Sequence, residues 1–253
     1  MVLIDYHKQC DRIKNVESHL EMQPNTLRLA RNNRGWTGTE AAQRLGVSQS
    51  YLAMLEGGQR GVTPPLARKF RAVYGLSPTS LPTPDLFEPR AQVDNEEFAK
   101  VLSALGYPGF AYRKGRVREK NPAEVLLEGL KQDSLEARLV EALPWLVMNY
   151  WDMNRGWLVR NAKLNDLQNR LGCVVALAKQ VSALSGQVNE DRDRALQELG
   201  ETIEESRLVR EDTFLKKVNT DVEREWLRQN RSEEAKHWNL LTNWRPEHFR
   251  YAF

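Results

Sequence analysis

NTLRLARNNRGWTGTEAAQRLGVSQSYLAMLEGGQRGVTPPLARKFRAVYGL, residues 25–76, contains a dense series of helix start and stop signals. Thr37, followed three positions later by Glu40, forms a capping box that predicts a helix. Gly46 permits a tight turn after that helix, because glycine adopts a positive φ at little cost. Ser48 is then placed to cap the next helix. The stretch therefore predicts two consecutive helices joined by a tight turn.

Further helices flank this pair. Asn25 or Thr26 is placed to cap a helix that precedes it. After the pair, Thr63-Pro64-Pro65 begins a fourth helix, since proline is tolerated in a first helical turn. Ser77-Pro78 begins a short fifth. We expect a compact bundle of five short helices, in which the third helix turns Leu52 and Leu55 inward.

The charge of the chain is unevenly divided. The net charge is +3, but residues 25–76 alone carry +6, which leaves the remainder at −3. Two acidic residues, Glu40 and Glu56, stand in this stretch against eight basic ones: Arg28, Arg31, Arg34, Arg44, Arg60, Arg68, Lys69 and Arg71. A positive bundle on a mildly acidic body indicates that a polyanion binds to the bundle.

The turn Gly-Val-Ser-Gln-Ser at residues 46–50, within the full helical pattern, resembles the helix-turn-helix domain of the lambda repressor/Cro (xenobiotic response element) family. The resemblance covers residues 25–76, about one fifth of the chain. It implies that the third helix enters the major groove of double-stranded DNA, where its N-terminal side chains reach base edges.

The resemblance also implies roles for individual side chains. Gln49, Ser50 and Met54 are expected to contact bases. The amide of Gln49 suits adenine, the hydroxyl of Ser50 can donate to or accept from a base, and Met54 suits a thymine methyl group. Phosphate contacts fall to Ser48, Gln59, Arg60 and Thr37. Arg31 is expected to pair with Glu56 and to tie the first helix to the end of the third. One position departs from the family pattern, because Gly38 replaces the Gln that usually begins the second helix and contacts phosphate.

The composition of the chain limits the classes of protein to which it can belong. The chain has 253 residues, 41% hydrophobic and 28% charged, which favours a soluble, helix-rich, all-α protein. The apolar runs are too short to span a membrane, and the N-terminus lacks the apolar core of a signal peptide, so we expect a cytoplasmic protein. Cys10 and Cys173 are expected to be reduced packing residues.

The domain organisation follows from prolines and apolar stripes. We expect an N-terminal helix at 1–24, the helix-turn-helix domain at 25–81, a proline-rich linker at 82–94 and a larger α-helical domain at 95–253. In the last domain the apolar spacing predicts long helices at about 135–151, 154–185, 189–217, 220–230 and 232–243.

Three segments are left open by their sequence. Residues 2–22 fit an amphipathic helix that packs on its own domain or on a partner. The basic segment with Arg113, Lys114, Arg116, Arg118 and Lys120 is either an ordinary solvated loop or an arm that reaches phosphates. The aromatic tail from Trp244 to Phe253 docks either on its own domain or on a partner subunit.

Motifs for catalysis and metal binding are weak. None of the four histidines stands at a metal-ligand spacing, and there is no glycine-rich phosphate loop. The spacing of Arg231 and His237 resembles the Arg-x(4–6)-His element of HEPN ribonucleases, in which Arg231 would hold a phosphate and His237 would act as general acid or base. About one such spacing arises by chance in a chain of this composition. We expect no enzyme activity, metal or cofactor.

The sequence therefore predicts a sequence-specific transcriptional regulator, an autorepressor that acts as a homodimer on an inverted-repeat operator. One alternative is an antitoxin in a toxin-antitoxin or phage-defence operon, which represses transcription and binds its cognate toxin through the helical domain. A more distant alternative is the HEPN-like ribonuclease.

Overall fold

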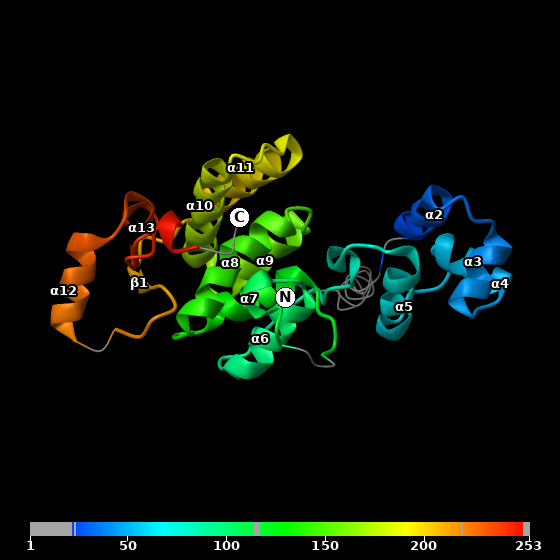
Figure 1. Ribbon diagram of the computed structural model, residues 1–253, viewed down its shortest axis with the longest axis horizontal. Helices are drawn as coiled ribbons and strands as arrows, with labels where there is room; N and C mark the ends of the chain where they lie inside the picture. Colours follow the sequence, from blue (N-terminus) through cyan, green and yellow to red (C-terminus); the bar gives the residue numbers. More distant parts are fainter. Residues whose placement is uncertain (1–21, 23, 114–116, 219, 250–253) are drawn as a thin grey trace, which may run out of the picture. The chain divides into compact units, whose positions relative to one another are not determined.

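The computed structural model describes residues 22, 24–113, 117–218 and 220–249, and it divides into two compact units between Phe87 and Glu88 (Figure 1). This division falls inside 82–94, the segment expected to be a linker. The N-terminal unit consists of α2 (Pro24–Asn33), α3 (Gly38–Leu45), α4 (Gln49–Glu56), α5 (Pro64–Tyr74) and the 3-10 turn η2 (Pro78–Ser80).

Local capping fixes the two central helices of this unit. The Thr37 hydroxyl accepts a hydrogen bond from the Glu40 N–H, and the Glu40 carboxylate accepts one from the Thr37 N–H at 2.8 Å. Gly46 has a φ of 59° after α3. The Ser48 hydroxyl accepts from the Tyr51 N–H at 3.1 Å at the start of α4. The first helix begins at Pro24, before the residues expected to cap it, because proline suits a first turn.

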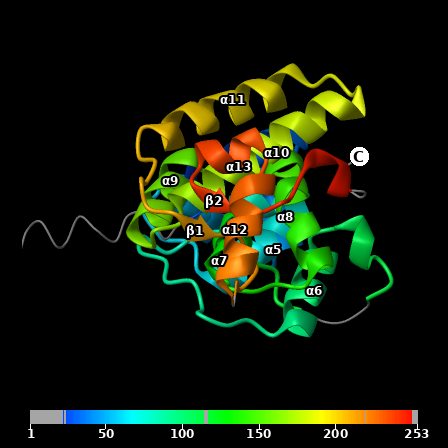
Figure 2. The same cartoon turned by 90° about the vertical axis from the view of Figure 1, so that its left-hand side faces the viewer.

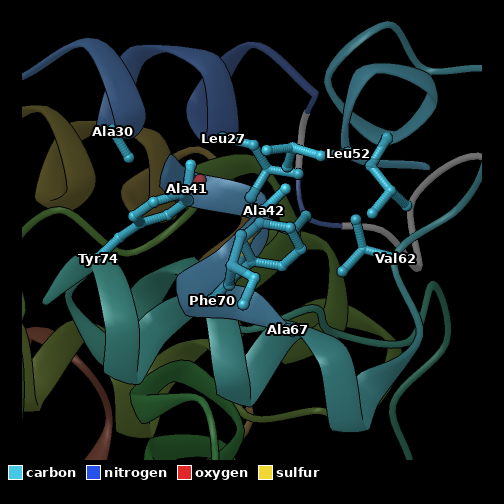
Figure 3. Close-up of a cluster of buried hydrophobic side chains, with 12 residues drawn as sticks. Leu27, Ala30, Ala41, Ala42, Leu52, Val62, Ala67, Phe70 and Tyr74 are labelled. Atoms are coloured by element: carbon cyan, nitrogen blue, oxygen red, sulfur yellow. The ribbon is translucent and has the colours of Figure 1, made fainter. Parts of the chain in front are cut away.

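The core of the N-terminal unit is a cluster of side chains contributed by all four α-helices (Figure 3). Leu27, Leu45, Leu52, Leu55 and Phe70 are each at most 1% exposed. Complete burial of a Leu or Phe side chain contributes about 2 kcal/mol. These contacts hold α4 so that its opposite face remains free.

An ion pair joins the first and third of these helices. Arg31 in α2 donates from Nε to Glu56 Oε1 at 2.7 Å and from Nη2 to Glu56 Oε2 at 2.9 Å. The Glu56 side chain is only 6% exposed, and Arg31 also donates to the Trp36 carbonyl at 3.0 Å. A bidentate pair of this kind fixes geometry as well as charge. The structure thus contains the pair that the resemblance implies.

The C-terminal unit is built around α10. Its helices are α6 (Asn95–Ala104), α7 (Pro122–Lys131), α8 (Ala137–Asn149), α9 (Arg155–Leu164), α10 (Gln168–Ser185), α11 (Glu190–Glu204), α12 (Asp221–Asn230) and α13 (Glu233–His237), with 3-10 turns η3 (Pro108–Phe110) and η4 (Pro246–His248). Two short parallel strands, β1 (Asp212–Thr213) and β2 (Leu240–Leu241), complete it. α10 packs against α8, α9, α11, α13 and η4. The prediction of an all-α fold, with a helix-turn-helix domain followed by further helices, is confirmed.

A buried arginine links α10 to its neighbours. Arg170, 7% exposed, donates from Nε to Asp212 Oδ2 at 2.8 Å. Its Nη1 donates to the carbonyls of Leu130 at 2.8 Å and Gln132 at 3.0 Å. The charge is therefore compensated and its donors are used, as a buried guanidinium requires.

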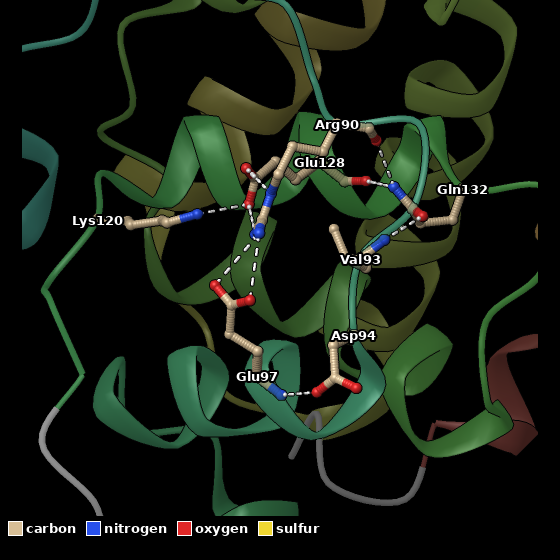
Figure 4. A network of polar contacts seen from close by, with 7 residues as sticks. All are labelled: Arg90, Val93, Asp94, Glu97, Lys120, Glu128 and Gln132. Atoms are coloured by element: carbon tan, nitrogen blue, oxygen red, sulfur yellow. Dashed lines mark hydrogen bonds and ion pairs between the residues drawn. The ribbon is translucent and has the colours of Figure 1, made fainter.

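A second polar network fastens the first residues of this unit to α7 (Figure 4). Arg90 Nε donates to Glu128 Oε1 at 3.1 Å, and Lys120 Nζ donates to Glu128 Oε2 at 2.8 Å. Gln132 Nε2 donates to the Arg90 carbonyl, while its Oε1 accepts from the Val93 N–H. Because Lys120 serves this network and Arg113 pairs with Glu96, both ends of the basic segment are held by carboxylates of the same unit.

The predicted long helices are shorter in the structure. The helix expected over 154–185 is two helices, because Asp166, with a φ of 58°, interrupts the helical backbone between α9 and α10. The helix expected over 189–217 ends at Glu204, and the one over 232–243 ends at His237. Buried Leu240 and Leu241 follow the latter, and they pair with β1 rather than continue a helix.

The structure describes only part of the segments whose role the sequence left undecided. The tail packs on α10 as far as Phe249, which is 1% exposed. The expected helix at 2–22 and Cys10 lie outside the described residues, apart from Met22, which is buried in the N-terminal core.

Cys173 is buried and free, and burial raises the pKa of its thiol to about 12, which fits a packing role. None of the described helices is long and apolar enough to cross a membrane.

Replacement of Arg31 should destabilise the N-terminal unit selectively. Arg31→Ala leaves the Glu56 carboxylate buried without its main cation, so we expect a loss of about 3 kcal/mol in the opening free energy of α4. Hydrogen exchange of the α4 amides measures this free energy. Arg68→Ala is the control, because Arg68 has no hydrogen-bond or ion-pair partner among the described residues. Equal exchange in both variants would contradict the role of the pair.

Glu124 should make the C-terminal unit less stable as the pH rises. Burial raises its pKa from 4.5 to about 7. Between these values the folded chain keeps a proton that the unfolded chain has lost, so stability falls across this range. Glu124→Gln should therefore stabilise the protein by about 2 kcal/mol above about pH 8, and by nothing below about pH 4. Denaturant unfolding at both pH values tests this, with exposed Glu88→Gln as control. A pH-independent difference would contradict it.

Candidate DNA-binding surface

The outer face of α4 presents a compact set of side chains. Gln49 and Ser50 are exposed in its first turn, and Met54 is partly exposed one turn later. Leu52 and Leu55 lie on the opposite, buried face. The structure therefore brings the three predicted base-contacting residues onto one face of one helix.

Ala53 belongs to the same face but was missed by the sequence reasoning. It is exposed, and it follows Gln49 by four residues, so the two lie one above the other on the helix. A methyl group here suits contact with a thymine methyl. The helical spacing from Gln49 was the signal that could have identified it.

The start of α3 lies beside the start of α4. A Cβ placed on Gly38 would stand 3.6 Å from Gln49 Nε2, which is ordinary van der Waals contact. Thr37 and Ser48, the N-caps of these helices, are both exposed. Two helix N-termini therefore open near Gln49, and such N-termini favour phosphate.

The residues predicted to contact phosphate differ in whether their side chains are already hydrogen-bonded within the protein. Ser48, Gln59 and Arg60 are exposed, and hydrogen bonds from the Gln59 and Arg60 N–H groups to the Met54 carbonyl fix the turn after α4. The Thr37 hydroxyl instead donates to Glu40 at 2.9 Å. The hydrogen bonds from Thr37 hold the pKa of the Glu40 carboxyl below its usual range, so this carboxylate is charged beside the site at neutral pH.

Fewer cationic side chains of this unit are free to bind phosphate than the net charge of +6 at residues 25–76 indicates. Arg31 is used by Glu56, and Arg34 donates to the Tyr74 carbonyl at 2.8 Å. Arg44 stacks on the Trp36 ring, 4.4 Å from its centroid. Lys69 Nζ lies against the turn, 3.0 Å from where a Cβ on Gly46 would stand. Arg60, Lys69 and Arg68 have no hydrogen-bond or ion-pair partner within the part of the chain that the structure describes.

The two residues of the ribonuclease alternative have different surroundings. His237 Nε2 lies 2.7 Å from Glu204 Oε2, whereas Arg231 Nε is buried and has no hydrogen-bond partner among the described residues. No hydrogen bond joins Arg231 to His237 among the residues described. No group of three potential metal ligands is found among them either.

Comparison with known protein families agrees with this geometry. Residues 25–82 match the family of helix-turn-helix domains, and this segment is a helix-turn-helix domain of the lambda-repressor type. A domain of this type indicates a sequence-specific DNA-binding regulator. No curated protein and no solved structure matches the chain.

Gly38→Gln should strengthen DNA binding. The position has room for a side chain, and an amide there would reach the phosphate contact that the family pattern has and this chain lacks. We expect about fivefold higher affinity, the effect of one added hydrogen bond. Gly38→Ala is the control for changes in helix stability, and fluorescence anisotropy with labelled duplex DNA measures both. Equal affinity of the two variants would contradict the expectation.

Proposed function

We propose that the protein is a transcriptional autorepressor that binds an operator as a homodimer and places α4 in the major groove. One observation carries the proposal. Gln49, Ser50 and Met54 lie side by side on the free face of a helix whose other face is buried in a helix-turn-helix domain.

Each side chain has a role in this proposal. Gln49 forms two hydrogen bonds with adenine, Ser50 donates to or accepts from a base, and Met54 contacts a thymine methyl group. Ser48, Gln59 and Arg60 contact the sugar-phosphate backbone and set the register of the helix, whereas the hydroxyl and the N–H of Thr37 both bind Glu40.

The proposed dimer follows from the small number of base contacts that one copy of the protein can make. Three base-contacting side chains give limited discrimination, since one mismatched base pair costs about 1–3 kcal/mol. A second copy related by a two-fold axis doubles the number of contacts and places two α4 helices roughly 34 Å apart, one turn of DNA. We assign the pairing of copies to the C-terminal unit, which leaves α4 free for DNA.

DNase footprinting on the DNA upstream of the gene for this chain tests the proposal. Two protected blocks with inverted-repeat sequence, about one helical turn apart, are expected. Addition of the protein should reduce transcription from that promoter. Absence of protection at low salt would exclude autorepression.

Two substitutions should separate sequence reading from phosphate binding. Gln49→Ala should lower the preference for the operator over altered sites by about tenfold and leave nonspecific binding unchanged. Arg60→Ala should weaken binding to all sequences and reduce the slope of log K against log salt by about 1. Titrations at several salt concentrations measure both effects. If the two variants behave alike, the assigned roles are wrong.

A further inference from the structure

α12 faces the viewer in Figure 2, and arginines gather along one side of it and at its C-terminal end. Arg224, Arg228 and Arg231 follow one another at spacings of four and three residues, so they leave the helix on the same side. Arg245 joins them from beyond β2, because its Nη2 donates to the carbonyl of Asn230, the last residue of α12, at 3.4 Å. We call these four arginines the arginine cluster.

One carboxylate binds two members of the cluster. Arg228 donates to both oxygens of Glu211, from Nε at 3.1 Å and from Nη2 at 2.9 Å. Arg224 donates from Nη1 to the same carboxylate at 3.3 Å. The hydrogen bonds from Arg228, followed by the bond from Arg224 and the charge of Arg231, hold the pKa of Glu211 below its usual range. This single negative charge neutralises only one of the three guanidiniums near it.

Arg231 has donors that no group of the chain uses. Its Nε atom is buried, and its side chain makes no hydrogen bond or ion pair with any other residue that the structure describes. A buried donor without an acceptor costs free energy, so native proteins supply such donors with an acceptor, from the protein, from water or from a bound ion. An anion with several oxygens is the acceptor that best suits the planar fork of a guanidinium.

The charge of the cluster indicates which anion fits. Within the described residues, the carboxylates bound to its four guanidiniums are those of Glu211 and Glu225, the latter 3.4 Å from Arg228 Nη1. Two positive charges remain, and the C-terminal end of α12 offsets only about half of one. A phosphate monoester carries between about 1.5 and 2 negative charges at neutral pH and has three acceptor oxygens, whereas a carboxylate carries one charge.

The unused donors are concentrated at one point. Arg224 and Arg228 are held by Glu211 along α12, so the free guanidinium of Arg231 and the remaining donors of Arg245 lie at the C-terminal end of the helix. A strand of DNA presents a row of phosphates, which a row of free cations matches. A single concentrated site suits one phosphate group instead.

We propose that the arginine cluster binds a small phosphate-bearing ligand at the C-terminal end of α12. Arg231 donates two hydrogen bonds to the phosphate oxygens, one of them from its buried Nε, and Arg245 donates a third. Glu211 fixes Arg224 and Arg228 beside the ligand, where their charge adds to the attraction. The proposal does not depend on DNA binding through α4, because no residue of the helix-turn-helix domain takes part.

Titration of the full chain with inorganic phosphate at constant ionic strength tests the proposal by calorimetry. We expect one saturable site with a dissociation constant on the order of 1 mM or lower, the strength of two or three charge-assisted hydrogen bonds. Acetate, which has one negative charge on two oxygens, is the control and should bind at least about tenfold more weakly. Equal binding of the two anions, or no binding of either, would overturn the proposal.

Variants locate the binding. Arg231→Gln removes the guanidinium and should weaken phosphate binding at least about tenfold. Arg245→Gln should also weaken it, and this exposed residue can be changed without disturbing a buried group. Arg160→Gln is the matched control, because Arg160 is exposed on α9 and makes no hydrogen bond or ion pair among the described residues. If all three variants bind phosphate alike, the cluster is not the site.

The same variants separate a small ligand from the DNA backbone. Each should bind duplex DNA like the unchanged protein, and circular dichroism checks that each is folded. Weaker DNA binding by Arg231→Gln and Arg245→Gln, but not by Arg160→Gln, would show that the cluster contacts DNA and would overturn its assignment to a small ligand. An operator footprint that fails would leave the phosphate titration unchanged, so the two proposals can fail separately.

Discussion

The ion pair between Arg31 and Glu56 is the constraint on which the N-terminal unit depends. It joins α2 to the last residue of α4. A further hydrogen bond, from Arg31 to the Trp36 carbonyl, attaches the loop before α3 to the same arginine. Glu56 is buried, so any shift of α4 away from α2 would leave a carboxylate without its partner. Recognition of bases needs this fixed orientation, because hydrogen bonds to base edges tolerate little displacement.

A buried arginine plays a comparable part in the C-terminal unit. Arg170 binds Asp212 of β1 and the carbonyls at the end of α7, so α10 is fixed to both. Around this fixed helix pack α8, α9, α11, α13 and η4.

Sequence reasoning succeeded where the deciding interactions are local. The caps at Thr37 and Ser48 and the turn at Gly46 depend on residues within four positions, and each is present in the structure. It failed where distant residues decide: the apolar stripe continues across Asp166, and Leu240 leaves the helical pattern only because β1 lies beside it. The resemblance predicted Gln49, Ser50 and Met54 as base contacts, and the structure shows that all three are at least partly exposed on one face of α4. The summed charge overstated how many cations are free for phosphate, because Arg31 is paired with Glu56.

Selection of DNA sites from a randomised duplex library by the full chain, at physiological salt, shows directly whether α4 reads DNA. We expect enrichment of one short half-site, present twice in inverted orientation with centres about one helical turn apart. The enrichment should relax at single positions when the library is selected again with Gln49→Ala. An unenriched library, or a motif unchanged by that substitution, would contradict the assignment of α4 as the helix that reads DNA.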